Sequence, residues 1–306
     1  MTHENVVAVG VDGSEPSKAA LKWALAQAQA RDAELRLVCV FQLPSYAMQQ
    51  YGLHPATLTQ QSNALYDAAQ RSVKELAASV EGQGVKVTWT LVDGDPAEVL
   101  VDLSKRVALV VVGGRGDSHG SIADRLLRTV SSAVPAYAYC PTVVVPQDCA
   151  NQRVPIKKIV VGMDGSDPAK IAVQRAVWEA DRWDAKLTVL SSVHVDSSPW
   201  APTYTVDRGF LEEVKDSVTA QLHEVDEGRE IDVHVEAREG NPIRLLAESS
   251  KEADLVVVGT RGHGGFAGLL LGSTSQMLLE LAKCPVMVVP RRIREGDDTG
   301  PVRDEQ

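Results

Sequence analysis

The chain has 306 residues, of which 44% are hydrophobic and 24% charged, as expected for globular domains, and its length suggests two of them. The 41 acidic residues outnumber the 31 basic ones, giving a formal net charge of −10. This charge argues against general nucleic-acid binding, which needs a basic surface. The sequence shows no secretion signal, no apolar run of the roughly 20 residues that span a bilayer, and no Cys-x-x-Cys pair. We therefore expect a cytoplasmic protein with neither nucleic-acid nor membrane partners.

Short runs of Val, Ile and Leu alternate with segments of helical period along the chain. In the first half, the sequence predicts strands at 6–11, 35–41, 85–92, 108–113 and 141–146, and helices at 16–30, 60–81, 96–106 and 129–138. In the second half, it predicts strands at 157–163, 187–193, 231–237, 254–259 and 285–290, and helices at 168–183, 208–227, 242–252 and 273–283. Such apolar strands are typical of parallel sheets with helices on both faces. The sequence predicts an α/β, Rossmann-like fold with five parallel strands in each half.

Three motifs occur twice in the same order, which indicates a duplicated domain. The first copies are GVDGS at 10–14, VVVGGRG at 110–116 and CPTVVVP at 140–146, and the second copies are GMDGS at 162–166, VVVGTRG at 256–262 and CPVMVVP at 284–290. We expect one domain at 1–147, a linker at 148–155 and a second domain at 156–292. Residues 293–306 mix charge, Gly and Pro without periodicity, which predicts a disordered tail.

An aspartate follows the first predicted strand of each half, Asp12 in one and Asp164 in the other. Open α/β sheets bind ligands beyond the carboxyl ends of their strands, so these carboxylates can accept hydrogen bonds from ligand amino or hydroxyl groups. The alternative is that each aspartate begins a turn or caps the following helix. Its presence in both copies favours the ligand-binding role.

A glycine-rich stretch joins the fourth strand of the second half to a helix that begins at Ser273. Glycines let backbone N–H groups approach an anion at positive φ, and the N-terminus of a helix favours phosphate. Arg261 and His263 can add positive charge, and the hydroxyl groups of Ser273 and Ser275 can donate hydrogen bonds. The stretch is therefore a candidate phosphate site, and the alternative is a flexible loop without a ligand.

On these motifs the chain resembles the universal stress protein family in its tandem, two-domain form, over residues 4–147 and 156–291. The resemblance implies two tandem open sheets, each of five strands in the order 3-2-1-4-5, with the fifth strands paired side by side. Nucleotide-binding members carry Gly-x2-Gly-x9-Gly-[Ser/Thr] after the fourth strand, and Gly259, Gly262, Gly272 and Ser273 match this pattern. The resemblance thus implies bound ATP, with Mg2+ held mainly through the phosphates.

The resemblance also implies which residues contact the nucleotide. Asp12 and Asp164 match the aspartate that contacts adenosine, and Val258 and Ser192 fall where the family lines the adenine pocket. The predicted contacts in the second half are Asp164, Ser192, Val258, Gly259, Arg261, Gly262, His263, Gly272, Ser273, Thr274 and Ser275. Those in the first half are Asp12, Val40, Gly113, Gly116 and Thr129.

The first half departs from the family pattern after Gly116. Eleven residues separate this glycine from Arg128, which stands opposite Gly272. A side chain at this position enters the space that a phosphate would occupy. A residue other than glycine is also restricted in the backbone φ and ψ angles that it can adopt. Arg128 can instead clamp the phosphate, although Asp117 and Asp124 oppose this through repulsion. The sequence predicts that the first half binds nucleotide weakly or in an altered pose.

The function expected on these grounds is that of an ATP-binding regulatory protein of the stress response, assembled as a dimer of tandem chains. Two other functions stay open. A slow ATPase or phosphotransferase has little support, because no catalytic pair occurs at local spacing and no catalytic residue is predicted. The second of these alternatives is a nucleotide-free, pseudo-dimeric scaffold. No protein metal site is predicted, because cysteines and histidines are scattered.

Overall fold

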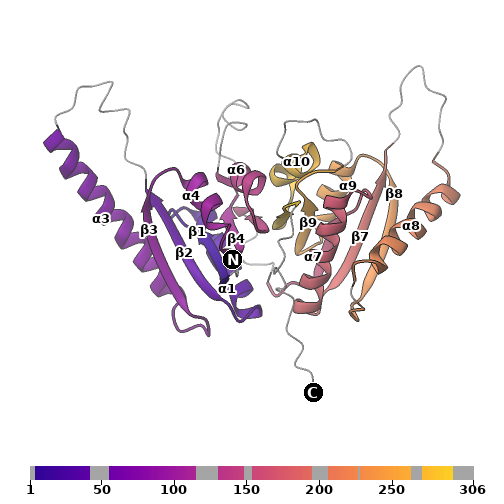
Figure 1. Ribbon diagram of the computed structural model, residues 1–306, viewed down its shortest axis with the longest axis horizontal. Coiled ribbons are helices and arrows are strands. Elements are labelled where there is room, and N and C mark those ends of the chain that lie inside the picture. The colour runs from indigo at the N-terminus through magenta and orange to yellow at the C-terminus, as the bar shows by residue number, and fades with distance from the viewer. Residues whose placement is uncertain are drawn as a thin grey trace.

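Strands and helices alternate through both halves of the computed structural model, which describes residues 4–41, 55–114, 130–147, 154–194, 206–226, 228–262 and 271–291 (Figure 1). The first half comprises β1 (Glu4–Gly10), α1 (Glu15–Ala30), β2 (Glu34–Phe41), α3 (Pro55–Val80), β3 (Val87–Asp93), α4 (Pro96–Leu103), β4 (Val107–Gly113), α6 (Val130–Tyr137) and β5 (Thr142–Val145). The second comprises β6 (Lys158–Gly162), α7 (Asp167–Trp183), β7 (Lys186–Val193), α8 (Arg208–His223), β8 (Val233–Glu239), α9 (Pro242–Ser249), β9 (Leu255–Gly259), α10 (Ser273–Leu281) and β10 (Val286–Val289). Each predicted element is present with ends shifted by a few residues. The predicted tail at 293–306 lies outside the described residues.

The strands of the described residues belong to one 10-stranded sheet, in the order β3-β2-β1-β4-β5-β10-β9-β6-β7-β8. Each half therefore has the order 3-2-1-4-5 that the family resemblance implied. The two halves meet where β5 pairs antiparallel with β10, with Val143 opposite Met287. This pairing satisfies the backbone groups that an isolated half would leave open at its β5 or β10 edge. The two predicted sheets are thus one continuous sheet.

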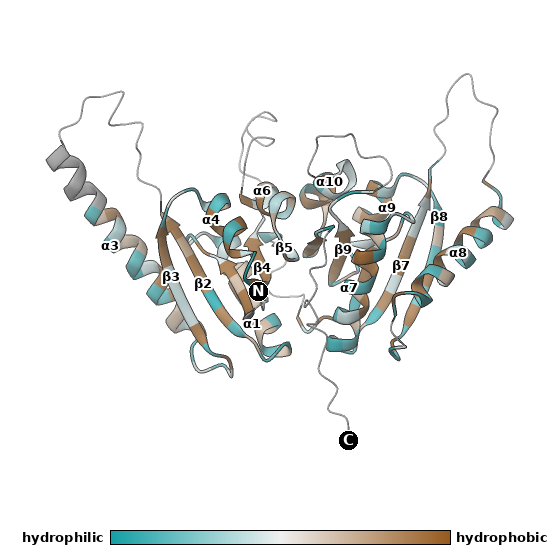
Figure 2. Cartoon of the chain, viewed as in Figure 1, coloured by the Kyte–Doolittle hydropathy of each residue, from teal (hydrophilic) through white to brown (hydrophobic). Residues whose placement is uncertain are grey.

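Helices cover both faces of the sheet, and the strands alternate their side chains between the faces. In β1, Val7 and Val9 pack toward α1 and α3, whereas Val6 and Ala8 pack toward α4 and α6. The core on the first face runs through both halves and includes α7 and α8. The central strands β4 and β9 are apolar along their length, as expected for strands buried on both sides (Figure 2). Among the described residues, no helix is long and apolar enough to cross a membrane.

Candidate functional site

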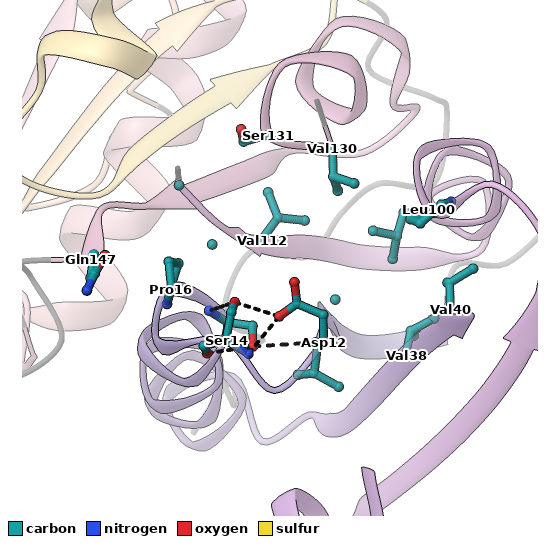
Figure 3. Close-up of a pocket in the computed structure, with 16 residues that line it drawn as sticks. Asp12, Ser14, Pro16, Val38, Val40, Leu100, Val112, Val130, Ser131 and Gln147 are labelled. Atoms are coloured by element: carbon teal, nitrogen blue, oxygen red, sulfur yellow. Dashed lines mark hydrogen bonds between the residues drawn. The ribbon is translucent and has the colours of Figure 1, made fainter. Parts of the chain in front are cut away.

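The first helix of each half begins directly after the repeated turn that carries its aspartate. In the first half, Ser14 is the N-cap of α1 and accepts a hydrogen bond from the Ser17 amide at 3.3 Å. Asp12 Oδ1 accepts from the Ser14 amide at 2.9 Å and from the Ser14 hydroxyl at 2.6 Å (Figure 3). In the second half, Asp164 Oδ1 accepts from Ser166 in the same way, at 3.0 and 2.6 Å. Both aspartates therefore stabilise a turn, and both also line a cavity.

The environment of Asp12 keeps its carboxyl group ionised. Burial raises the pKa of Asp12, but the hydrogen bonds from the Ser14 hydroxyl and amide outweigh this effect, so the pKa lies below its ordinary value. The carboxylate consequently accepts hydrogen bonds at neutral pH and has no proton to donate. This suits recognition of ligand hydroxyl or amino groups.

A cavity of about 300 Å³ opens at the carboxyl ends of β6, β7 and β9 in the second half. Every second-half residue that the sequence predicted as a contact, and that the structure describes, lines this cavity; His263 lies outside the described residues. The lining residues are Asp164, Ser192, Val258, Gly259, Arg261, Gly262, Gly272, Ser273, Thr274 and Ser275. The fold thus brings together side chains from three strand ends and the start of α10, although the sequence separates them by about 110 residues.

The N-terminus of α10 faces this cavity without a side-chain cap. Its N-cap is Gly272, which has no side chain to accept a hydrogen bond from the first turn. The three residues that follow, Ser273, Thr274 and Ser275, line the cavity. The helix dipole and the backbone N–H groups of this turn therefore favour an anion there.

Two details of the predicted phosphate loop are wrong. Gly272 has φ −69° and ψ 154°, which any residue can adopt, so its role is not conformational. It is spatial, because a Cβ would lie 3.3 Å from the carbonyl oxygen of Thr260. Ser275 is buried and its hydroxyl donates to the carbonyl oxygen of Gly259 at 2.7 Å, so that hydroxyl holds the helix start rather than being available to donate to a ligand.

The glycine that ends the fourth strand has a packing role in both halves. A Cβ on Gly113 would lie 2.6 Å from the backbone carbonyl group of Pro16, and one on Gly259 would lie 2.8 Å from the carbonyl oxygen of Pro168. These glycines let the first helix approach the end of the fourth strand. They therefore shape the cavities even without contacting a ligand.

The first half contains an equivalent cavity of about 710 Å³ (Figure 3). Asp12, Val40 and Gly113, which the sequence analysis named as nucleotide contacts, line this cavity, whereas Gly116 and Thr129 lie outside the described residues. The first turn of α6 contributes Val130, which occupies the place of Thr274 in the repeat. An apolar side chain thus replaces a hydroxyl at this position.

The comparison with known families agrees with the duplicated architecture. The family model described as "Universal stress protein family" matches residues 5–146 and again residues 155–290. The chain belongs to the universal stress protein family. This assignment supports a role in the stress response.

Universal stress proteins with two domains resemble this chain along most of its length. One from Mycolicibacterium smegmatis is 34% identical over 303 residues, which cover 94% of this chain and 97% of the relative. Universal stress protein Rv1996 from Mycobacterium tuberculosis is 31% identical over 305 residues, covering 92% and 94%. The crystal structure of a universal stress protein from Archaeoglobus fulgidus has the same fold, with a TM-score of 0.70, 22% identity and coverage of 94% of this chain and 97% of that chain.

The third helix of each universal stress protein domain supplies cavity residues that the sequence analysis missed. Leu100 and Pro96 line the first cavity, and Leu246 and Pro242 line the second. A signal was present in a fourth repeated segment, GDP at 94–96 and GNP at 240–242. The middle residue of each segment caps the following helix. This repeat could have placed α4 and α9 beside the ligand.

The described residues hold no group of three or more His, Cys, Asp or Glu side chains that could bind a metal ion. Among the described residues that line the second cavity, Arg261 carries the positive charge.

Proposed function

We propose that this universal stress protein binds ATP in the cavity of its second half and that nucleotide occupancy regulates its role in the stress response. The observation that carries the proposal is the position of the uncapped N-terminus of α10 on the same cavity as the Asp164 carboxylate. The end of the cavity at α10 suits an anion, and the end at Asp164 suits the hydrogen-bond donors of a ligand. A nucleotide presents both kinds of group.

The proposed pose follows from the chemistry of the lining. The adenosine part lies toward Asp164, Ser192 and Val258, and the triphosphate lies toward Arg261 and the first turn of α10, residues 273–275. Charge-assisted hydrogen bonds contribute about 1.5–3 kcal/mol each, so three or four give micromolar affinity. Mg2+ would bind mainly through phosphate oxygens, as expected where the described residues offer no metal cluster.

We propose that the first half binds the nucleotide more weakly or in an altered pose. It retains the aspartate, Asp12, but Val130 replaces Thr274 at the helix start, and the sequence places Arg128 where the second half has Gly272. The adenosine end is therefore common to both halves, and the phosphate end differs.

Isothermal titration calorimetry with MgATP tests this assignment, and the duplication supplies matched controls. We expect Asp164→Ala and Gly272→Arg to remove the tighter binding event and Asp12→Ala to leave it intact. Thermal melts without nucleotide check that each variant is folded. The assignment is wrong if both second-half variants bind ATP at full stoichiometry.

The remaining expectations belong to the same proposal. Cys39, Cys140 and Cys284 are buried and none of them is in a disulfide, which supports a reducing, cytoplasmic location. We further propose a homo-oligomer of tandem chains.

Mass spectrometry of nucleotide released from the purified protein separates a nucleotide-binding protein from a nucleotide-free scaffold, because the scaffold releases no adenine nucleotide.

A further inference from the structure

Two short helices straddle the junction between the halves and present apolar side chains to solvent. We call α6 and α10 together the junction platform (Figure 1). Tyr137 is 54% exposed, Leu281 44% and Met277 39%, although all three are large and hydrophobic. Charged residues make up 24% of the chain, yet the platform carries a single one, Glu280. Exposed apolar surface of this kind marks an interaction site.

The platform continues the contact that joins the two halves. Ala136 of α6 packs against the apolar cluster of the second half, and Leu279 of α10 packs against the clusters of both halves. The helix α6 also contacts β5 and α10 contacts β10, and these two strands pair with each other. The exposed side chains thus extend an interface that already exists in the chain.

The two helices of the platform are equivalent by duplication, although Met277 stands opposite Ala133 and Glu280 opposite Ala136. Tyr137 and Leu281 each precede the repeated Cys-Pro of their half by three residues, so they occupy equivalent positions about the β5–β10 junction. A surface that repeats about a two-fold axis can meet a copy of itself through the same contacts twice. The low charge of the platform matters equally, since it carries only Glu280, whereas two chains of net charge −10 repel each other elsewhere.

We propose that a second copy of this chain docks on the junction platform, and that a ligand in the second cavity changes the strength of this association. The aromatic ring of Tyr137 and the side chains of Met277 and Leu281 form the centre of the contact, where few residues dominate the energy of binding. The control of this association by a ligand rests on the proposed function.

The coupling follows from the dual role of α10. Its first turn, residues 273–275, lines the second cavity, and the same helix presents Met277 and Leu281 on one exposed face, four residues apart. Leu278, between them, is fully buried, so the helix is anchored in the core. A ligand that engages the helix start therefore acts on the element that carries the docking surface, and by linkage the two binding events influence each other.

Sedimentation velocity on the full chain, stripped of nucleotide and studied over a range of concentrations, tests the docking. We expect the wild-type chain to form dimers, and Tyr137→Glu, Leu281→Glu and Met277→Lys each to weaken the association by at least about tenfold. Phe210→Glu is the control, because Phe210 is 47% exposed but lies on α8, far from the junction (Figure 1). Thermal melts verify folding. A monomeric wild-type chain, or three platform variants that dimerise normally, overturns the docking.

The same measurement with saturating MgATP tests the coupling. We expect the dimer dissociation constant to shift by at least about threefold, and Asp164→Ala, a substitution outside α10, to abolish this shift. If calorimetry shows ATP binding without a shift, the coupling is wrong. If calorimetry shows no ATP binding, both the proposed function and the coupling fail, while the nucleotide-free experiment still decides the docking.

Discussion

The guanidinium of Arg31, in the first half, donates a hydrogen bond to the carboxylate of Glu179, in the second half, and both side chains are buried. Two further guanidinium groups approach the same carboxylate oxygen, from Arg175 at 3.3 Å and Arg182 at 3.1 Å. Burial raises the pKa of Glu179, but the positive charges of Arg31, Arg182 and Arg175 outweigh it and lower the pKa to about 2. This charge cluster ties α1 to α7 and holds the halves together.

Glu179→Gln should strongly destabilise the protein. The substitution removes the only negative charge of the four side chains and leaves three buried guanidinium groups facing one another, for which the expected loss is about 3–5 kcal/mol in the free energy of unfolding. Urea unfolding at neutral pH measures this loss. Glu15→Gln is the control, since Glu15 forms an exposed ion pair with Lys18 and its replacement should change little. Equal effects of the two substitutions would contradict the assigned role of Glu179.

Stability should also fall in acid, and Glu179 should contribute to that fall. Its pKa is about 2 in the folded protein against 4.5 for an unperturbed glutamate, so the unfolded chain binds the proton more readily. The stabilisation is therefore complete above about pH 4.5 and is lost as the pH falls toward 2. Urea unfolding of wild type and Glu179→Gln at several pH values measures the difference, which should shrink through this window. Parallel pH profiles would exclude the proposed linkage.

Gly262→Ala should weaken ATP binding in the second half without unfolding the domain. A Cβ at this position would lie 2.1 Å from Asp164 Oδ2, so the carboxylate must leave its present position, while Ser166 holds its other oxygen. We expect the affinity for ATP to fall by about tenfold or more, or about 1.4 kcal/mol, in calorimetric titration. Gly209→Ala, on the exposed start of α8, should bind ATP as the wild type does.

Gly113→Ala should destabilise the first half whether or not a ligand is present. The added Cβ would meet the backbone carbonyl group of Pro16 at 2.6 Å, and backbone yields less readily than a side-chain end. Overpacking of this kind costs about 1–3 kcal/mol, which thermal or urea unfolding without nucleotide would detect. An unchanged stability would mean that α1 can shift freely and that Gly113 serves the ligand alone.

Much of the fold could be predicted because its causes are local or repeated. Apolar runs and helical periods gave the strands and helices, and Pro16 and Pro168 marked the starts of helices that the structure caps with Ser14 and Ser166. The second-half cavity was also predictable in large part, because strand ends converge at one edge of a parallel sheet. The contribution of Leu246 was missed, because a leucine on a helix carries no sign of which cavity it faces.

Other features depend on distances that no local pattern encodes. In the sequence, Gly272 resembled a glycine required for an unusual backbone conformation. Its φ is ordinary, however, and a side chain is disfavoured there because the Thr260 backbone lies close by. Ser275 resembled a ligand contact, but its hydroxyl already donates to Gly259. Both outcomes depend on how the end of β9 approaches the start of α10.

The sequence by itself determined the duplicated α/β architecture and the residue types at the strand ends, because periodicity, helix caps and repetition act over short stretches of chain. Only the tertiary structure decided that Arg31 meets Glu179, 148 residues away, and that the Thr260 backbone leaves no room for a side chain at Gly272. Those contacts arise when distant segments bury one another, and the free energy of that burial depends on shape and distance in three dimensions.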